Sequence, residues 1–310
     1  MKKTLKDFGE LIFCLFFGAM IQDYLRLMRP HQWVKNVFIL LPVFFGVRIT
    51  EIRTLMMAMT GVAAFSCIAS AVYIFNDWRD IKVDRLHPTK KYRPLAAELI
   101  PIRGALILMG VLLAVGMSIL AWYDHRAFHL GLVYIGMNLL YSVWLKHISL
   151  LDIFVIALGF VIRLGIGSTI VDPNIPLSMW IVVMTFLGAL FLGLAKRRDD
   201  VLLAAEGLKV RRSVKSYNLP FVNGGMVMMA SVLIVGYLSY VSNPETMDHF
   251  QTENLYFTGA FVILGVLRYM QITFVEQRSG NPTRILLSDR FLQITIAGWL
   301  ATFIWLIYLG

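Results

Sequence analysis

Cysteine and charge are both scarce in this chain. Only two of the 310 residues are cysteines, Cys14 and Cys67, and both lie in apolar runs, so neither a disulfide framework nor a cysteine-based metal site is expected. Charged residues make up 15% of the sequence, 58% is hydrophobic, and the mean hydropathy is +0.70. A soluble domain needs far more polar cover, so the composition predicts an all-α polytopic membrane protein.

Linkers, low-complexity tracts and soluble appendages are also missing, so we expect one helical transmembrane domain over residues 1–310, surrounded by membrane lipids. No basic stretch of the sequence belongs to a recognisable nucleic-acid-binding motif, which argues against a nucleic-acid partner. The apolar run Leu11–Ile21 is too short to span, so residues 1–23 are expected to form a cytoplasmic or interfacial lead-in helix. Nine apolar spans follow: residues 37–47 (with a start nearer Tyr24), 55–75, 102–122, 127–144, 150–171, 176–194, 221–241, 256–273 and 292–309.

Lysine and arginine are distributed unevenly between the two sides of these spans. With the amino terminus in the cytoplasm, 24 of the 29 basic residues fall in cytoplasmic segments and only Arg48, Arg53 and Arg126 fall outside. The positive-inside rule therefore predicts a cytoplasmic amino terminus and an external carboxyl terminus. The net charge of +10 mostly reflects this topology.

Carboxylates gather where the second expected span ends. The run Leu55–Phe75 has no charged residue, and the next nine residues have the spacing N-D-x-x-D-x-x-x-D, formed by Asn76, Asp77, Asp80 and Asp84. At about 100° per residue on a helix, the three carboxylates fall within about 60° of one another. Like charges this close repel unless a cation lies between them. Mg²⁺ takes carboxylate oxygens and shares its other positions with phosphate, so the motif predicts a metal-held diphosphate at a membrane surface. The alternative is a solvated helix end whose acids balance nearby basic residues.

Basic residues near this motif suit a polyanionic ligand, although membrane topology alone explains about half of them. Arg85, Lys90 and Arg93 follow the motif directly. Lys35 leads into the first apolar run, where an interfacial anchor is the alternative, and Lys196 and Arg197 end the sixth span.

Three further polar residues lie in or beside apolar spans. Tyr141 and Lys146 close the fourth span, and snorkelling is a sufficient explanation for Lys146. Arg163 lies deep in the fifth span, where a charge costs at least ~2.5 kcal/mol. Arg163 either snorkels to the outer face or faces a polar cavity, where it pairs with an anion or with Asp152.

The Asn76–Asp84 motif resembles the hallmark of the UbiA-type superfamily of intramembrane prenyltransferases. The resemblance implies nine transmembrane helices around a central cavity, two large cytoplasmic loops over the active site, and Mg²⁺ for diphosphate binding. The aromatic prenyltransferases of that superfamily carry a second D-x-x-x-D after the sixth helix. Here the equivalent segment reads LAKRRDD, without the four-residue spacing.

The segments LRPHQWVKN, NDWRDIKVDRLHPTKKYRPLA, GLAKRRDD and NPTRILLSDR resemble more specifically the decaprenyl-phosphate phosphoribosyltransferase branch. That branch transfers 5-phosphoribose from phosphoribosyl diphosphate (PRPP) to a polyprenyl phosphate and releases diphosphate. The resemblance implies a bacterial inner-membrane enzyme of cell-envelope polysaccharide synthesis, with its active site facing the cytoplasm.

The resemblance also assigns roles to the residues singled out above. Asp77, Asp80 and Asp84, with Asn76 in support, would bind Mg²⁺ and the diphosphate of the donor. The donor phosphates would contact Arg85, Lys90, Arg93, Lys196 and Arg197. The acceptor phosphate or the cavity lining would involve Lys35, Tyr141, Lys146 and Arg163.

Two other functions fit the sequence less well. One is a prenyltransferase that moves a polyprenyl group from its diphosphate to an aromatic or lipid acceptor. The other is a lipid-phosphate transporter, although paired repeats with broken helices are not evident. The oligomeric state is left open, and a homo-oligomer is compatible with the sequence.

Overall fold

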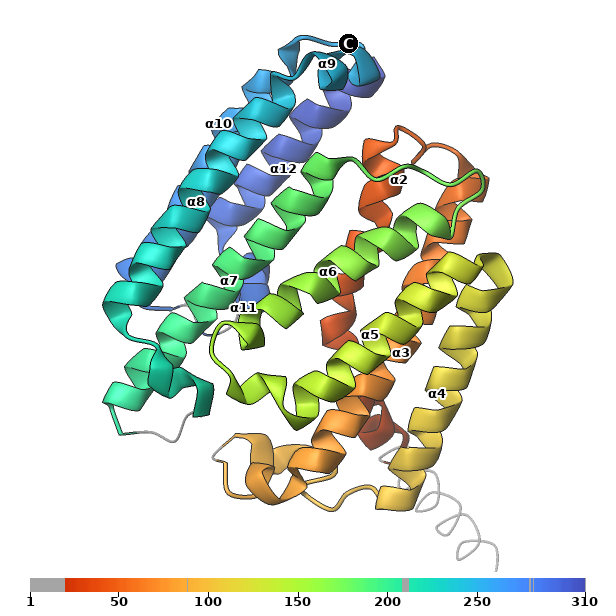
Figure 1. Cartoon of the computed structure of the whole chain (residues 1–310), viewed down its shortest axis with the longest axis vertical. Coiled ribbons are helices and arrows are strands. Elements are labelled where there is room, and N and C mark those ends of the chain that lie inside the picture. Colours follow the sequence, from red (N-terminus) through yellow and green to blue (C-terminus); the bar gives the residue numbers. More distant parts are fainter. Residues whose placement is uncertain (1–19, 88, 208–211, 279, 281, 310) are drawn as a thin grey trace, which may run out of the picture. The chain divides into compact units, whose positions relative to one another are not determined.

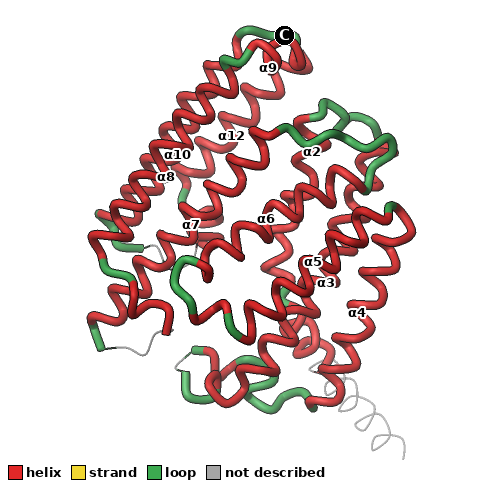
Figure 2. The backbone as a smooth tube through the Cα atoms, in the orientation of Figure 1, coloured by secondary structure: helices red, strands yellow, loops and turns green. Residues whose placement is uncertain are grey.

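The computed structural model describes residues 20–87, 89–207, 212–278, 280 and 282–309. Within these ranges the regular elements are helices, and no strand is present (Figure 2). The all-α class is therefore confirmed for the part of the chain that is described. Most of the expected lead-in segment Leu11–Ile21 lies outside the described residues.

Seven segments of the described chain are helical, long and apolar enough to cross a membrane. This makes the chain a multi-pass membrane protein. The seven segments are α3 (Ile52–Asp84), α4 (Ile102–Tyr123), α6 (Leu151–Thr169), α7 (Met179–Ala205), α8 (Leu219–Val241), Asn254–Phe274 with η5 (Asn254–Thr258) and α10 (Gly259–Phe274), and Arg290–Tyr308 with α12 (Arg290–Ile304) and most of η6 (Trp305–Leu309).

Two of the nine expected spans are not among these seven. The expected span 127–144 corresponds to α5 (His125–Val143), whose hydropathy is lowered by His125, His129 and Asn138. The expected span 37–47 is divided between a 3₁₀ helix, η1 (Pro30–Leu40), and the short α2 (Leu41–Phe45). The nine-span architecture therefore stays a prediction.

The chain divides into two compact units. The first comprises the described residues up to Ser142 together with Ile162–Ile175, and the second comprises Val143–Val161 and the chain from Pro176 onward. Helix α6 contributes its carboxyl-terminal part to the first unit and its amino-terminal part to the second.

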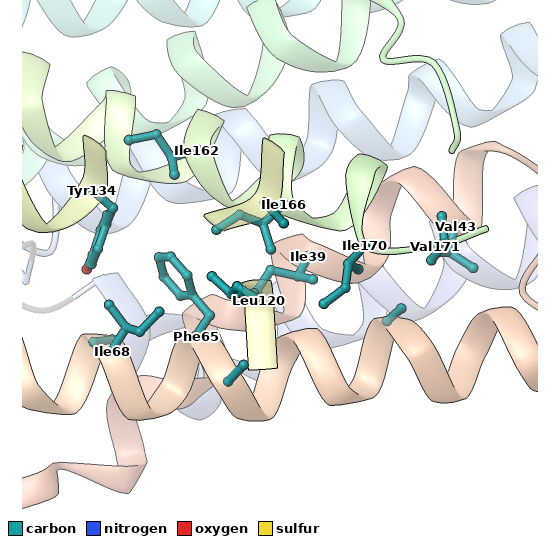
Figure 3. Packing of buried hydrophobic residues seen from close by; sticks show 14 of the residues in the cluster. Ile39, Val43, Phe65, Ile68, Leu120, Tyr134, Ile162, Ile166, Ile170 and Val171 are labelled. Atoms are coloured by element: carbon teal, nitrogen blue, oxygen red, sulfur yellow. The ribbon is translucent and has the colours of Figure 1, made fainter. Parts of the chain in front are cut away.

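The first unit is built around α3. Helix α3 packs along α4 and against η1 (Figure 1). Its largest core includes Ile39 from η1, Phe65 from α3, and Ile166 from α6 (Figure 3). A Cβ atom on Gly167 would lie 2.0 Å from the backbone oxygen of Ile39, so the absence of a side chain allows η1 to pack directly on α6.

Short 3₁₀ turns lie in two of the connections between the longer helices. The loop between α3 and α4 contains η2 (Lys90–Tyr92), and η3 (Leu145–His147) precedes α6. The loop after α3 is the one that brings basic residues back to the acidic motif.

In the second unit, α7 packs along α8, and α10 contacts both α8 and α12. Side-chain caps mark the starts of α8 and α12 among others, because Asn218 accepts a hydrogen bond from Phe221 N and Asp289 accepts one from Leu292 N. The remaining short elements are η4 (Arg212–Ser216), α9 (Pro244–Phe250) and α11 (Pro282–Ser288).

Candidate active site

Two buried carboxylates near the end of α3 converge on one guanidinium group. The side chains of Asp77 and Asp84 are only 2% and 4% exposed. They are seven residues apart, close to two helical turns, so they share one face as the spacing predicts. Arg93 Nη1 donates to Asp77 Oδ1 at 3.0 Å and to Asp84 Oδ2 at 2.7 Å. The loop after α3 thus returns a cation to the acidic end of the same helix.

A second arginine reaches Asp77 from the amino-terminal segment. Arg29 lies between helical residues 20–28 and η1, and its backbone is left-handed, with φ 55° and ψ 59°. A residue other than glycine rarely adopts this conformation. Arg29 Nη2 donates to Asp77 Oδ1 at 2.5 Å, and its guanidinium lies 5.1 Å from the centre of the Tyr73 ring. Backbone strain at a residue that contacts a buried acid is typical of functional sites.

Asn76 is oriented by a contact from α5. The Ser142 hydroxyl lies within hydrogen-bond distance of the side-chain oxygen of Asn76 and of the backbone oxygen of Asn138, the latter at 2.7 Å, and its single proton can be donated to either. An amide oxygen has two lone pairs, so this hydrogen bond leaves one for another donor or a hard cation. The contact with Ser142 has no signal in the sequence motif.

A pocket of about 620 Å³ opens beside these groups. Its volume falls within the range of small-molecule sites, about 300–1,000 Å³. The lining combines guanidinium groups, a buried carboxylate and neutral hydrogen-bonding groups, and includes Arg26, Arg29, Gln32, Asp77, Tyr92 and Arg93. This mixture of charges suits a phosphate ligand that arrives with a cation.

A third arginine is buried inside the first unit. Arg163 is 5% exposed, and its guanidinium lies 4.7 Å from the centre of the Phe65 ring and 5.4 Å from that of Tyr134. Its Nε donates to Asn36 Oδ1 at 2.9 Å. Stacking against aromatic faces and hydrogen bonding to an amide both stabilise a desolvated guanidinium. Arg163 is therefore held in the interior of the unit, and the alternative that it snorkels to the outer face is wrong.

The cation of Arg163 belongs to a polar group that also involves η1. Asn36 donates through Nδ2 to Ser66 Oγ at 2.8 Å, and Lys35 lies within electrostatic range of both Arg29 and Arg163. Ionisable residues inside a membrane protein are costly and are usually functional. These side chains extend the positively charged region from the pocket toward the core of the first unit.

Asp152, considered from the sequence as a partner for Arg163, is engaged in the second unit. Arg197 Nε lies 2.9 Å from Asp152 Oδ2, and the carboxylate accepts hydrogen bonds from Ser213 Oγ at 3.0 Å and Tyr217 Oη at 2.9 Å. Arg197 also pairs with Asp200. Burial and the neighbouring carboxylate raise the pKa of the Tyr217 hydroxyl, so it remains a donor.

The other residues expected at the site are placed as follows. Arg85 is exposed and pairs with Glu98 at 2.5 Å, and Asp80 is half-buried on α3. Half-buried positions are also found for Lys90 and Tyr141 in the first unit and for Lys146 in the second, where Lys196 is exposed. The role of Asp80 in binding Mg²⁺ and diphosphate stays a prediction, as do the roles of the other residues in contacting phosphates or lining the cavity.

Arg29 and Asn36 contact the candidate site but were not among the residues expected there. The available signal was their position on either side of Lys35 in the polar segment before the first apolar run. The left-handed backbone that directs Arg29 toward Asp77 is invisible in that signal.

The turn that follows α3 contains a titratable group outside the spanning helices. His87 Nδ1 accepts hydrogen bonds from the backbone N–H groups of Thr89 at 3.2 Å and Lys90 at 3.4 Å. Burial, together with the neighbouring Lys90 ammonium, lowers the pKa of His87, because both disfavour the imidazolium form. A neutral imidazole can accept these bonds, whereas a protonated one cannot.

The carboxylate oxygens of the candidate site are ligands of the kind that a small hard cation prefers, but they are too few to fill its coordination sphere. Asp77 and Asp84 present oxygens that already share one positive group, Arg93 Nη1. Among the described residues, however, no group of three or more His, Cys, Asp or Glu side chains is gathered closely enough to hold a metal by itself. A bound metal would need further oxygens, such as those of Asn76, water or a phosphate ligand.

Comparison with solved structures identifies the fold class. A UbiA homologue from Archaeoglobus fulgidus, solved with GPP and Mg²⁺, superposes with a TM-score of 0.67 over 92% of this chain and 99% of that chain, at 21% identity. The chain therefore has the fold of these membrane proteins.

Sequence comparison then identifies the family. The model of the UbiA prenyltransferase family matches residues 37–297, and the chain belongs to this family. A decaprenyl-phosphate phosphoribosyltransferase from Mycobacterium tuberculosis is 32% identical over 291 residues, covering 91% of this chain and 93% of that protein. The enzyme of the same name from Mycolicibacterium smegmatis is 30% identical over 294 residues, covering 91% and 92%.

Proposed function

We propose that this protein transfers 5-phosphoribose from PRPP to a polyprenyl phosphate and releases diphosphate, with Mg²⁺ as cofactor. The observation that carries the proposal is the convergence of Asp77 and Asp84 on Arg93, beside a pocket of the first unit that Asp77, Arg29 and Arg93 line. The similarity to decaprenyl-phosphate phosphoribosyltransferases over nine-tenths of the chain supports this choice of substrates.

The donor is a polyanion, and the pocket offers it several positive groups. Arg29 and Arg93 each have further N–H donors beyond those on the carboxylates, so they can contact the diphosphate or the 5-phosphate. Asp77 and Asp84, with Asn76 in support and Asp80 on the same helix, would hold Mg²⁺. When bound, Mg²⁺ neutralises the charge that develops on the departing diphosphate.

The acceptor phosphate enters the reaction as the nucleophile. One of its oxygens forms a bond to C1 of the ribose as the bond from C1 to the diphosphate oxygen breaks, and the electron pair leaves with the diphosphate. A phosphate oxygen is already anionic, so this step needs positioning and charge screening and no general base. The proposed contacts of the acceptor are Lys35 and Arg163. Tyr141 and Lys146, at the end of the fourth expected span, are further candidates.

The arrangement in the membrane belongs to the same proposal. We infer nine spans around a central cavity, a cytoplasmic amino terminus, and an active site that faces the cytoplasm of a bacterial inner membrane. Arg85, Lys90 and Lys196 would then contribute positive charge on the cytoplasmic side, where the water-soluble donor arrives. Arg197 is buried against Asp152 and Asp200, so a phosphate would reach it only in exchange for one of these carboxylates. A homo-oligomer is compatible with this arrangement.

A transfer assay with membrane-embedded protein tests the proposal. PRPP labelled in the ribose is incubated with decaprenyl phosphate, with Mg²⁺ and with EDTA, and the label is measured in the lipid phase. We expect Mg²⁺-dependent label in the lipid that is lost in Asp77→Asn. If the label stays in water while a polyprenyl diphosphate is consumed with an aromatic acceptor, the result would support a prenyltransferase instead. If neither pair of substrates reacts, both the phosphoribosyltransferase and the prenyltransferase functions would be overturned.

A further inference from the structure

The first unit contains a second hollow with a different chemical character. It has a volume of about 410 Å³ and is bounded by the helical residues 20–28 on one side and the start of α4 on the other. Its walls are apolar apart from the Tyr24 hydroxyl and the backbone, and they are formed by Tyr24, Leu25, Met28, Gly104, Ile107 and Leu108, with Ile21 and Val111 at the ends. We call this hollow the α4 groove.

The sequence builds the α4 groove from matching faces of two helices. The lining positions are 21, 24, 25 and 28 on one helix and 104, 107, 108 and 111 on the other. Both sets have the spacing i, i+3, i+4, i+7, which places side chains on one helical face. A Cβ atom on Gly104 would lie 2.2 Å from Tyr24 Oη, so the lack of a side chain there lets the two helices approach at the groove floor.

The α4 groove adjoins the charged pocket of the candidate active site. Leu25 lines both hollows. Arg26 on the same helix and Arg29 at the corner that follows it line the pocket, and Arg29 donates to Asp77. One short helix therefore presents an apolar face to the groove and a cationic face to the pocket.

This pairing matches an amphiphile that has an anionic head and a single apolar chain. We propose that the α4 groove binds the first isoprene units of the polyprenyl phosphate acceptor while its phosphate enters the adjoining pocket. The inference rests on the proposed function and names the part of the unit that recognises the lipid chain. An isoprene chain in the bilayer is already in apolar surroundings, so the groove would select it through shape and van der Waals packing.

Tryptophan substitutions that fill the groove test the proposal in the full-length protein. Leu108→Trp and Ile107→Trp place a large side chain in the groove, and Ile107 is 68% exposed, so the second variant places little demand on folding. Gly110→Trp is the matched control, because it lies on the same helix with no atom within 4 Å of its added Cβ.

The chain-length dependence of the Michaelis constant is the readout. We expect both groove variants to raise the KM for decaprenyl phosphate about tenfold, which corresponds to about 1.4 kcal/mol. We expect the KM for geranyl phosphate to rise by a similar factor, because its two isoprene units are the ones that the groove binds, and the KM for PRPP to stay at the value of the unsubstituted protein. All three parameters should stay unchanged in Gly110→Trp. An unchanged KM for decaprenyl phosphate, or a rise confined to decaprenyl phosphate, would overturn the proposal.

A binding measurement separates this inference from the proposed function. A decaprenyl phosphate analogue with a photoreactive group near the phosphate is crosslinked to the protein without PRPP, and the labelled peptides are mapped. Labelling of residues 20–28 or 102–112 that Leu108→Trp abolishes supports the groove, even where no ribose transfer occurs. Labelling confined to other helices refutes lipid binding in the α4 groove. It does not affect the proposed transfer reaction, which the ribose-labelling assay tests separately.

Discussion

Arg197 and Asp152 form an ion pair that is almost completely buried in the second unit. Arg197 Nε lies 2.9 Å from Asp152 Oδ2, and the two side chains are 1% and 0% exposed. The same carboxylate holds Ser213 and Tyr217 from the segment after α7. The pair therefore joins the start of α6 to the end of α7 and to the loop that follows it.

Breaking this pair is expected to destabilise the protein strongly. Asp152→Ala leaves the buried Arg197 guanidinium with Asp200 as its remaining carboxylate partner, and breaking a buried ion pair by removing one partner typically costs about 3–5 kcal/mol. Tyr217→Phe removes two hydrogen bonds, one donated to Asp152 and one accepted from Leu150 N, and should cost about 2 kcal/mol. Thermal unfolding in detergent measures both. Arg53→Ala is the control, because the Arg53–Asp172 pair is 79% and 72% exposed and should contribute little; equal losses in Asp152→Ala and Arg53→Ala would contradict the structural role.

Removal of either buried carboxylate at the end of α3 should abolish turnover. In Asp77→Asn and Asp84→Asn we expect kcat to fall at least about 100-fold, because charge neutralisation at the leaving group is lost. Membrane expression should be retained, since each change is isosteric. Glu98→Gln, at a carboxylate that is 72% exposed, should keep normal activity. Full activity of either aspartate variant would eliminate the metal assignment.

Arg93 should affect metal binding and donor binding in opposite directions. In Arg93→Gln the carboxylates of Asp77 and Asp84 lose the cation that they share and repel each other, so Mg²⁺ should bind more tightly in the absence of donor. The KM for PRPP should rise about tenfold through the loss of a charged hydrogen bond. Isothermal titration with Mg²⁺ and steady-state kinetics give the two values. Weaker Mg²⁺ binding in the variant would argue that Arg93 only orders the loop.

Arg163 is expected to act on the acceptor and not on the donor. Arg163→Met removes the interior cation and should raise the KM for the polyprenyl phosphate about tenfold, while the KM for PRPP stays constant. Arg163→Lys keeps the charge but loses the planar stacking between Phe65 and Tyr134, so an intermediate value is expected. Parallel increases in both Michaelis constants would place Arg163 outside acceptor recognition.

His87 should make the turn after α3 sensitive to acid. Its pKa is lowered in the folded protein, so the unfolded chain binds more protons and stability increases with pH. The stabilisation is fully present above the unfolded pKa of about 6.5 and is lost as the pH falls below it. His87→Asn keeps a hydrogen-bond acceptor without titrating, so its kcat/KM should decline less steeply below pH of about 6.5. Identical pH profiles for the two proteins would exclude His87 as the cause.

Long apolar runs are the part of the fold that the sequence predicts best. Their length alone requires helices in a bilayer, and seven of the expected spans have matching long apolar helices. Helix α5 and the η1–α2 segment are harder to predict as spans. Polar residues lower the hydropathy of α5, and 3₁₀ winding divides the η1–α2 segment into two short helices.

Within the candidate site, periodicity predicts neighbours on one helix but not contacts between segments. The common face of Asp77 and Asp84 follows from their spacing. The approach of Arg29 depends on a left-handed backbone, and the hydrogen bond from Ser142 to Asn76 depends on how α5 packs against α3. Such contacts arise from tertiary packing, which no local pattern of residues specifies.

The left-handed backbone of Arg29 gives this residue two tasks at once. Its main chain is the corner between residues 20–28 and η1, and its side chain is bonded to Asp77. Because both roles fall on one residue, a shift of residues 20–28 would also shift the guanidinium that is bonded to Asp77. Replacing Arg29 with glycine would relax the backbone at this corner and remove that hydrogen bond.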